Sequence, residues 1–157
     1  MMIVRAVFAF LALPAVVAGL VPALIVRGAT PDRGFLSAGT ALLSAGGFLL
    51  LWCVRDFFVS GRGTLAPWDP PKHLVVVGLY RHVRNPMYLA VLTVLAGWSL
   101  LYASGRVAIY AALIAVLFHV RVIAHEEPWL SRQFGAEWDA YRASVPRWLP
   151  RVRWKLG

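Results

Sequence analysis

The stretch PMYLAVLTVLAGWSLLYASGRVAIYAALIAVLFHVRVIA, residues 86–124, contains two long apolar runs joined by a short polar turn. Each run, Pro86 to Ala103 and Val107 to Ala124, is long enough to match the hydrocarbon core of a bilayer. The turn Ser104-Gly105-Arg106 predicts a tight antiparallel helical hairpin. His119 and Arg121 fall in the final turns of the second run, where basic side chains reach the membrane interface.

Two further apolar runs precede this hairpin, at residues 6–26 and 35–54, each bracketed by arginines. The first run is too long for a typical signal-peptide core and has no clear cleavage site, so we interpret it as a retained span. The chain is 60% hydrophobic and 15% charged, whereas about a quarter of the residues in a soluble domain are charged. The sequence therefore predicts an all-α polytopic membrane protein with four transmembrane helices in one integral membrane domain.

Between the second and third spans, residues 55–85 are predicted to form a loop. Gly and Pro interrupt any continuous helix there, at Gly61, Gly63, Pro67, Pro70 and Pro71. Asn85-Pro86 ends the loop with a preferred N-cap residue and a preferred first helical residue, so a helix should begin at that point.

After the fourth span, residues 125–157 contain a second helical pattern. Aromatic and apolar residues recur on one helix face, at Trp129, Leu130, Phe134, Trp138 and Tyr141. Polar and charged residues lie on the opposite face. This pattern predicts a C-terminal amphipathic helix on the membrane surface.

The formal net charge is +9, which raises the question of a nucleic-acid partner. The basic residues lie in the polar gaps between apolar runs, so membrane orientation explains them better and no nucleic-acid partner is expected. With four spans, 13 of the 16 Lys and Arg fall on one side, and only Arg27, Arg33 and Arg106 fall on the other. The positive-inside rule then places both termini and the long loop in the cytoplasm. The expected location is a bacterial inner membrane.

Several kinds of site receive little support. Cys53 is the only cysteine and lies in an apolar run, which indicates a buried small hydrophobe and no disulfide. His119 and His125 are six residues apart and face different sides of a helix, so no metal site is predicted. A haem or metal redox protein using these histidines is a remote alternative. No Gly-rich phosphate loop follows a strand, which excludes a Rossmann-type nucleotide site.

Two polar segments at helix ends are the candidate site. Residues 78–88 read GLYRHVRNPMY and place several polar side chains at the start of a span, where they are costly unless they line a site. A basic and aromatic interfacial anchor is the alternative. Glu126 and Glu127 are adjacent carboxylates that need cations nearby in a low dielectric, unless they form a solvated helix end. Arg81, Arg84 and Arg147 lie on the same predicted side.

Together these segments resemble a known family. Gly78 to Tyr88 is followed, across one helical hairpin, by Glu126-Glu127-x-x-Leu130, Phe134-Gly135, Tyr141 and Val145-Pro146. This order and spacing, over roughly residues 60–150, resembles the isoprenylcysteine carboxyl methyltransferase and phospholipid methyltransferase family of integral membrane enzymes. Eukaryotic members have Arg-His-Pro-x-Tyr-x-Gly where this chain has Arg84 to Ala90, so Asn85 replaces the family histidine and His82 lies one turn earlier.

The resemblance implies methyl transfer from S-adenosylmethionine to a lipophilic acceptor, at a cytoplasmic site enclosed by the last two spans and the C-terminal segment. The residues that it implies for cofactor binding are Tyr80, Arg81, His82, Arg84, Asn85, Tyr88, Glu126, Glu127 and Tyr141. In this hypothesis Arg81 or Arg84 holds the cofactor carboxylate. Arg147 orients an acceptor carboxylate, and Glu127 is the second candidate catalytic residue, as a base where the acceptor is an ammonium group.

Three acceptors remain open at this stage: an isoprenylcysteine-like carboxylate, the ethanolamine head group of a phospholipid, and a small thiol. A different class of function is a non-catalytic four-span subunit or transporter, in which the polar cluster is only an anchor. The partners expected in the first class are a lipophilic substrate and the surrounding membrane lipids.

Overall fold

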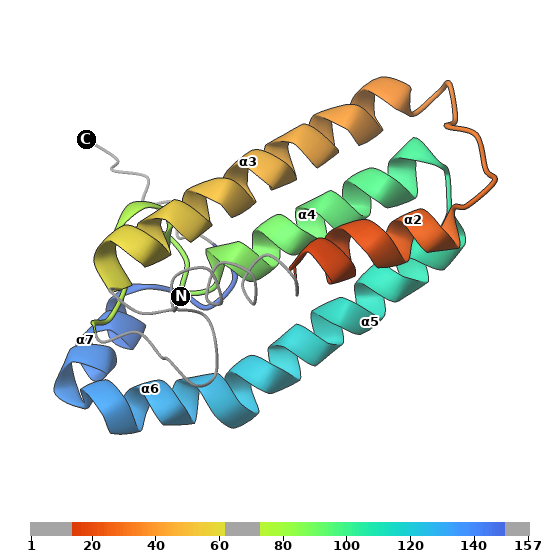
Figure 1. Cartoon of the computed structure of the whole chain (residues 1–157). Helices are drawn as coiled ribbons and strands as arrows, with labels where there is room; N and C mark the ends of the chain where they lie inside the picture. The colour runs from red at the N-terminus through yellow and green to blue at the C-terminus, as the bar shows by residue number, and fades with distance from the viewer. Residues whose placement is uncertain (1–13, 62–72, 150–157) are drawn as a thin grey trace, which may run out of the picture.

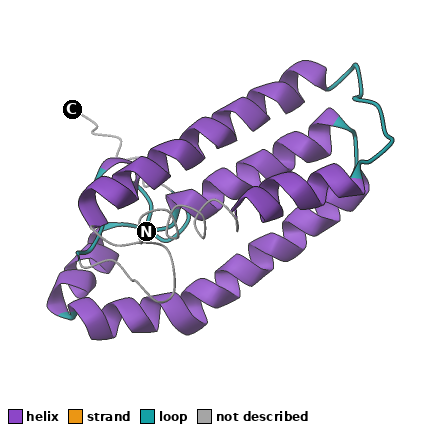
Figure 2. Ribbon diagram, viewed as in Figure 1, coloured by secondary structure: helices purple, strands orange, loops and turns teal. Residues whose placement is uncertain are grey.

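The computed structural model describes residues 14–61 and 73–149. In these residues every regular element is helical, and no strand occurs (Figure 2). The elements are η1 (Val16–Leu20), α2 (Val21–Ile25), α3 (Leu36–Gly61), η2 (Gly78–Arg81), α4 (Pro86–Leu101), α5 (Gly105–Arg121), η3 (Val122–Glu126), α6 (Glu127–Phe134) and α7 (Ala136–Ser144). The all-α prediction is confirmed over the described part of the chain.

Helices α2, α3, α4 and α5 lie lengthwise beside one another and form a bundle (Figure 1). The α4–α5 turn and the α2–α3 connection lie at one end of this bundle. At the other end, α6 and α7 approach the segment 73–85 that leads into α4. The two polar segments singled out in the sequence therefore meet at a single end of the bundle.

Two helical stretches are long and apolar enough to cross a membrane, Leu36–Phe57 and the continuous Gly105–Phe134. Val16–Ile25 and Pro86–Leu101 are apolar but shorter. Residues 6–13 of the predicted first span lie outside the described residues, so the four-span arrangement stays a prediction. Cys53 is fully buried beside Val75 and Tyr80, as expected of a small hydrophobe.

Several predicted boundaries were wrong. Helix α3 continues to Gly61, so the first residues of the predicted loop are helical. Helix α4 ends at Leu101, and α5 begins at Gly105 with Ser104 as its N-cap, so the three-residue turn lies at Tyr102 to Ser104, two residues earlier than predicted. The start of α4 at Pro86 is confirmed, but the side chain of Asn85 does not cap it. Asn85 instead donates from Nδ2 to the Arg147 carbonyl, 3.2 Å away.

The prediction of a single amphipathic helix on the membrane surface was also wrong. The helix from α5 runs on through η3 into α6, and the chain then breaks at Gly135, whose φ of +50° favours glycine. Helix α7 turns back after this break. Trp138, Tyr141 and Val145 are buried against Leu74, Leu130 and Phe134. The aromatic face therefore packs inside the protein, because the break lets it close over the segment before α4.

Close backbone approach holds α3 and α4 together. A Cβ added to Gly46 would lie 2.8 Å from the backbone nitrogen of Val94, and one added to Gly97 would lie 2.7 Å from that of Leu43. Without a hydrophobic driving force between helices in lipid, small residues at the interface give the packing that associates them. Gly47, the next residue along α3, has nothing within 4 Å of such a Cβ.

We predict opposite effects of alanine at these two neighbouring glycines. Gly46→Ala should destabilise the fold by about 1–3 kcal/mol, because the added methyl group overpacks the α3–α4 contact. Gly47→Ala should be neutral or stabilise by up to about 1 kcal/mol, because alanine favours helix. Unfolding in mixed micelles with increasing dodecyl sulfate measures both. Equal effects of the two substitutions would contradict the packing described.

Pro22 determines how the first helical segment is held against the bundle. The N–H that Pro22 lacks leaves carbonyls of the preceding turn without a donor, and this turn is the π-helix η1. Two neighbouring helices supply donors instead: Trp98 Nε1 donates to the Ala18 carbonyl at 2.9 Å, and the Tyr110 hydroxyl donates to the Val17 carbonyl at 3.1 Å. Freed backbone groups in membrane helices are commonly satisfied in this way. The same two bonds fasten η1 to α4 and α5.

Removal of one of these donors should weaken the bundle measurably. Tyr110→Phe is expected to cost about 1 kcal/mol, the scale of an interhelical hydrogen bond in a membrane protein. Tyr102→Phe is the matched control, since no described residue bonds its hydroxyl, and it should change nothing. The same micelle titration detects the difference, and an unchanged Tyr110→Phe midpoint would show that the bond contributes nothing.

Candidate functional site

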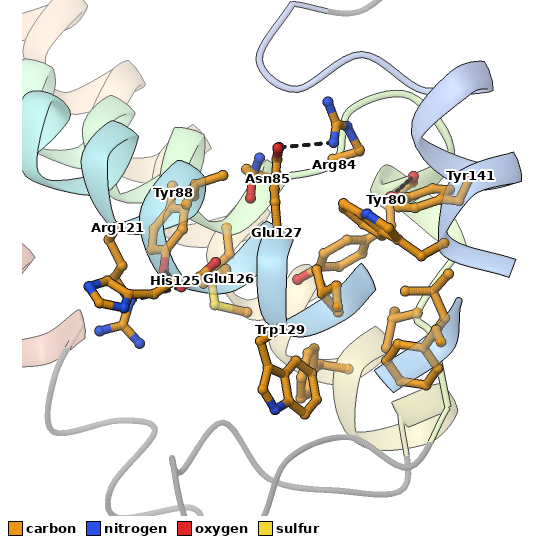
Figure 3. A pocket seen from close by; sticks show the side chains of 18 of the residues that line it. Tyr80, Arg84, Asn85, Tyr88, Arg121, His125, Glu126, Glu127, Trp129 and Tyr141 are labelled. Carbon is orange, nitrogen blue, oxygen red and sulfur yellow. Dashed lines mark hydrogen bonds and ion pairs between the residues drawn. The ribbon is translucent and has the colours of Figure 1, made fainter. Parts of the chain in front are cut away.

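A cavity of ≈ 500 Å³ lies at the end of the bundle where α6 and α7 meet the start of α4. Its volume is within the usual range for sites that bind small molecules or cofactors. Apolar and aromatic side chains form most of the wall, and polar groups from α4, α5, η3 and α6 project into it (Figure 3). This combination of an apolar wall and a few convergent polar groups is typical of a ligand site.

The wall on the α7 side is fixed by hydrogen bonds to the segment before α4. The buried Tyr141 hydroxyl donates to the Tyr80 carbonyl at 2.7 Å, and the backbone N–H of Arg84 donates to the Pro146 carbonyl at 2.9 Å. Tyr80 enters the wall from the turn η2, which begins at Gly78 with φ +54°. A Cβ at Gly78 would collide with the Asp56 carboxylate, so glycine is required there.

An ion group defined by Arg84, Glu127 and Arg147 lies on this wall. Arg84 Nη1 donates to Glu127 Oε1 at 2.9 Å (Figure 3). Arg147 binds both carboxylate oxygens, with Nε 2.6 Å from Oε1 and Nη2 2.8 Å from Oε2. Such bidentate, charge-assisted pairs are among the stronger hydrogen bonds in proteins. The group joins the start of α4, the start of α6 and the segment after α7.

Arg84 keeps one donor without a partner. Its side chain is 11% exposed, and the guanidinium carbon Cζ lies 5.4 Å from the centre of the Trp138 ring. Among the described residues, nothing accepts a hydrogen bond from its buried Nε. Burial lowers the pKa of Arg84 from its ordinary value, but a guanidinium titrates so far above neutrality that it stays charged. Arg84 also lines the cavity, so a ligand that carries an acceptor group is the natural partner for this unsatisfied, charged side chain.

A second ion group, defined by Tyr88, Arg121 and Glu126, lies on the α5 side of the cavity. The Tyr88 hydroxyl donates to Glu126 Oε1, and Arg121 Nε donates to the same oxygen at 2.8 Å. His125 lines the cavity next to this group (Figure 3). The Tyr88 ring stacks on Phe118 with centroids 4.2 Å apart, which fixes its position.

The π-turn η3 creates this second group. Arg121 and Glu126 are five residues apart, so in a regular α-helix they would point about 140° away from each other. In η3 the Glu127 N–H bonds to the Val122 carbonyl five residues back, and this wider turn brings Arg121 and Glu126 onto one side. Pro128 follows directly and lacks the N–H that a regular helix would use there. Turns of this kind occur often at functional sites.

The phenols on the α7 side stay protonated at neutral pH. Burial is the main cause that raises the pKa of Tyr80 and of Tyr141 well above the ordinary value. They therefore supply aromatic wall and neutral hydrogen-bonding groups to the site. In residues 14–61 and 73–149, no group of three or more His, Cys, Asp or Glu is placed to hold a metal ion.

Comparison with known proteins gives this cavity a chemical context. The family model described as phospholipid methyltransferase matches residues 35–137, which carry most of the cavity wall. The chain belongs to the phospholipid methyltransferase family. The protein is thus a member of a family of membrane methyltransferases, in agreement with its apolar helices.

Two curated relatives are similar to this methyltransferase family member. The nickel-cobalt-cadmium resistance protein NccN of Alcaligenes xylosoxydans xylosoxydans is 31% identical over 102 residues, which are 65% of this chain and 43% of that protein. The chain thus spans less than half of the length of this relative. An uncharacterized protein of Haemophilus influenzae is 32% identical over 63 residues, 40% of this chain and 100% of that protein. No solved structure matches the chain significantly.

The structure brings most of the predicted cofactor-binding residues to one cavity. Those that line it are Tyr80, Arg84, Asn85, Tyr88, Glu126, Glu127 and Tyr141. Arg81 and His82 are exposed and do not line the cavity. Arg147, predicted to orient an acceptor, is bound to Glu127 and is not among the residues that line the cavity. The roles of all these residues stay predictions.

Sequence reasoning did not select four residues that line the cavity, Arg121, His125, Trp129 and Arg132. The sequence indicates an interfacial side chain for Arg121 and no metal-binding role for His125. The signal that would have found them is Pro128, because a proline inside a helical pattern predicts a distorted turn before it. A π-turn at 122–126 changes which residues of that helix share a face.

We predict that Glu127→Gln destabilises the fold by about 2 kcal/mol, because it leaves the two half-buried arginines without their counter-ion. Asp139→Asn is the matched control, since Asp139 pairs with Arg142 on the surface and both side chains are 55% exposed. That change should stay within about 0.5 kcal/mol. Thermal unfolding in detergent measures both, and a Glu127→Gln protein as stable as the Asp139→Asn protein would remove the structural role of the ion group.

Proposed function

We propose that the cavity binds S-adenosylmethionine and that the protein transfers its methyl group to a lipophilic acceptor, in the manner of isoprenylcysteine carboxyl methyltransferases. The observation that carries this proposal is the buried Arg84 Nε, a charged donor without a partner among the described residues, in the wall of a cavity with aromatic sides. The cofactor has a carboxylate for such a donor and an adenine ring for such a wall.

In this proposal the cofactor lies on the α7 side of the cavity. Arg84 holds its carboxylate, while Tyr80, Trp138 and Tyr141 form the apolar wall beside the adenine and the sulfonium. Between Arg81 and Arg84, the two arginines that the sequence offered for this role, only Arg84 lines the cavity. Glu127 and Arg147 act on the cofactor through Arg84, whose guanidinium they hold in place.

Catalysis then depends on placement. A sulfonium is already an excellent leaving group, so in-line positioning and the exclusion of water supply most of the rate enhancement. The reaction is a displacement in which an acceptor lone pair forms the new bond to the methyl carbon. The bond between that carbon and sulfur breaks, its electron pair stays on sulfur, and the products are S-adenosylhomocysteine and the methylated acceptor.

The ion pairs favour an acceptor that needs no base. Glu127 already accepts from two arginines, and Glu126 accepts from Tyr88 and Arg121. Glu127, the candidate base, is committed to its two arginines and is therefore a poor acceptor for a proton from an ammonium group. A carboxylate acceptor is nucleophilic without deprotonation, so this arrangement supports carboxyl methylation over N-methylation of an ethanolamine head group.

The proposed site faces the cytoplasm, at a bacterial inner membrane. The support is the charge distribution, in which 13 of the 16 Lys and Arg fall on the side of the cavity if all four apolar segments cross the membrane. A soluble methyl donor made in the cytosol would reach the cavity from that side.

Calorimetric titration of the protein in phosphatidylcholine nanodiscs with S-adenosylmethionine tests the proposal. The expected dissociation constant is in the micromolar range, and Arg84→Gln should weaken binding by about tenfold or more, because a charge-assisted bond is lost. Arg81→Gln is the matched control, three residues earlier and exposed, and should bind like the unmodified protein.

Arg84→Lys separates binding from folding, because it keeps the charge opposite Glu127 but loses the Nε donor. The Arg84→Lys protein should remain folded, and yet it should bind the cofactor more weakly than the unmodified protein does. Absence of any heat from well-folded, unmodified protein would overturn the proposal, and so would an equal loss of affinity in the Arg81→Gln and Arg84→Gln proteins.

A further inference from the structure

The second ion group of Tyr88, Arg121 and Glu126 has no part in holding the methyl donor as proposed. It nevertheless lines the same cavity, together with His125 (Figure 3). Arg121 could reach the membrane interface from the end of its helix at little cost, but charged groups that face a cavity next to an apolar helix commonly mark a substrate site. The group therefore requires its own explanation.

The two ion groups differ in their distance from the apolar part of the bundle. Arg121 precedes Glu127 by six residues along one continuous helix, which is about 9 Å of rise. Immediately before Arg121, the exposed side of α5 is apolar, with Leu113, Val116, Leu117 and Val120 each more than half exposed. If α5 spans the membrane, Arg121 lies at the level where hydrocarbon gives way to head groups, whereas Glu127 lies closer to the solution.

Arg121 also has donors to offer. Its Nε donates to Glu126 and its side chain lies beside the Tyr88 hydroxyl, while Nη1 and Nη2 are not bonded to any carboxylate or carbonyl of the described residues. Its side chain is 54% exposed, so the remaining fork is accessible. Two parallel guanidinium donors match the geometry of a carboxylate or a phosphate. Exposed Arg132 also lines the cavity and adds a second positive charge to it.

We propose that Arg121 binds the anionic head group of the lipophilic acceptor and so selects acidic amphiphiles as substrates. This inference rests on the proposed function, because it assigns the acceptor to the same cavity as the methyl donor. The donor occupies the side of Arg84, the acceptor head lies at Arg121, and the acceptor's hydrocarbon chain extends into the bilayer beside α5. Glu126 fixes the guanidinium through Nε, and the π-turn η3 makes that contact possible.

The test uses calorimetry on the protein in phosphatidylcholine nanodiscs, with empty nanodiscs subtracted. The probes are dodecyl phosphate, dodecanoate and dodecyltrimethylammonium, with inorganic phosphate as a head group that lacks a chain. The unmodified protein should bind the two anionic amphiphiles and bind inorganic phosphate and the cationic amphiphile at least about tenfold more weakly. The stronger of the two anionic probes tells whether a phosphate or a carboxylate is preferred.

Arg121→Gln should weaken binding of the anionic amphiphiles by about tenfold or more, which corresponds to one lost charge-assisted bond. Its affinity for S-adenosylmethionine should stay within about twofold, which also shows that the variant is folded. Arg106→Gln, an exposed arginine at the other end of α5, is the matched control and should change neither affinity. Arg121→Lys keeps the charge but loses the pair of parallel donors. Its affinity for the anionic amphiphiles should lie between those of the unmodified and Arg121→Gln proteins.

Three results would overturn the inference. The first is that the unmodified and Arg121→Gln proteins bind the anionic amphiphiles equally well. The second is that Arg121→Gln loses S-adenosylmethionine and amphiphile binding to the same extent, and the third is that the unmodified protein prefers the cationic amphiphile. If Arg121→Gln does not fold, an Arg121→Lys protein that binds dodecyl phosphate and dodecanoate as tightly as the unmodified protein would overturn it as well. Failure of the unmodified protein to bind S-adenosylmethionine, with Arg121-dependent binding of dodecyl phosphate intact, would instead sink the proposed function and leave the anion site standing.

Discussion

The carboxylate of Glu127 connects three separate parts of the chain. It accepts hydrogen bonds from Arg84 before α4 and from Arg147 after α7, while its own backbone begins α6. Because an unpaired arginine is costly in a half-buried place, these contacts hold the C-terminal segment against the start of α4. The cavity exists between those parts, so its shape depends on this ion group.

The direction in which Glu127 points depends in turn on a helix defect. Helix α5 reaches the site as a regular apolar helix, and the turn η3 then widens by one residue before Pro128. The two adjacent glutamates thereby face different partners, Glu126 toward Tyr88 and Arg121, and Glu127 toward Arg84 and Arg147. This separation gives the cavity two ion groups at different depths, which is the arrangement that a polar methyl donor and a lipophilic acceptor would need.

The bundle provides a rigid support for this end of the molecule. Helices α3 and α4 approach so closely that glycine is required at Gly46 and Gly97, and η1 is fastened by donors from α4 and α5. Rigid helices limit the movement of the side chains that they carry. That is a favourable basis for a reaction in which accurate placement of two substrates is the main catalytic device.

The sequence by itself determined the helical class, the hairpin of α4 and α5, the start of α4 at Pro86, and most of the residues that gather at the site. These features follow from local signals, namely apolar run length, a proline at a first helical position, and polar groups at helix ends. The tertiary structure decided which polar groups pair. Arg84 lines the cavity while Arg81 is exposed, Asn85 bonds to Arg147 instead of capping its helix, and Trp138 and Tyr141 pack inward beyond the break at Gly135. Those choices depend on contacts between residues some twenty to sixty positions apart in the chain and on one widened helical turn, which a 3.6-residue periodicity does not encode.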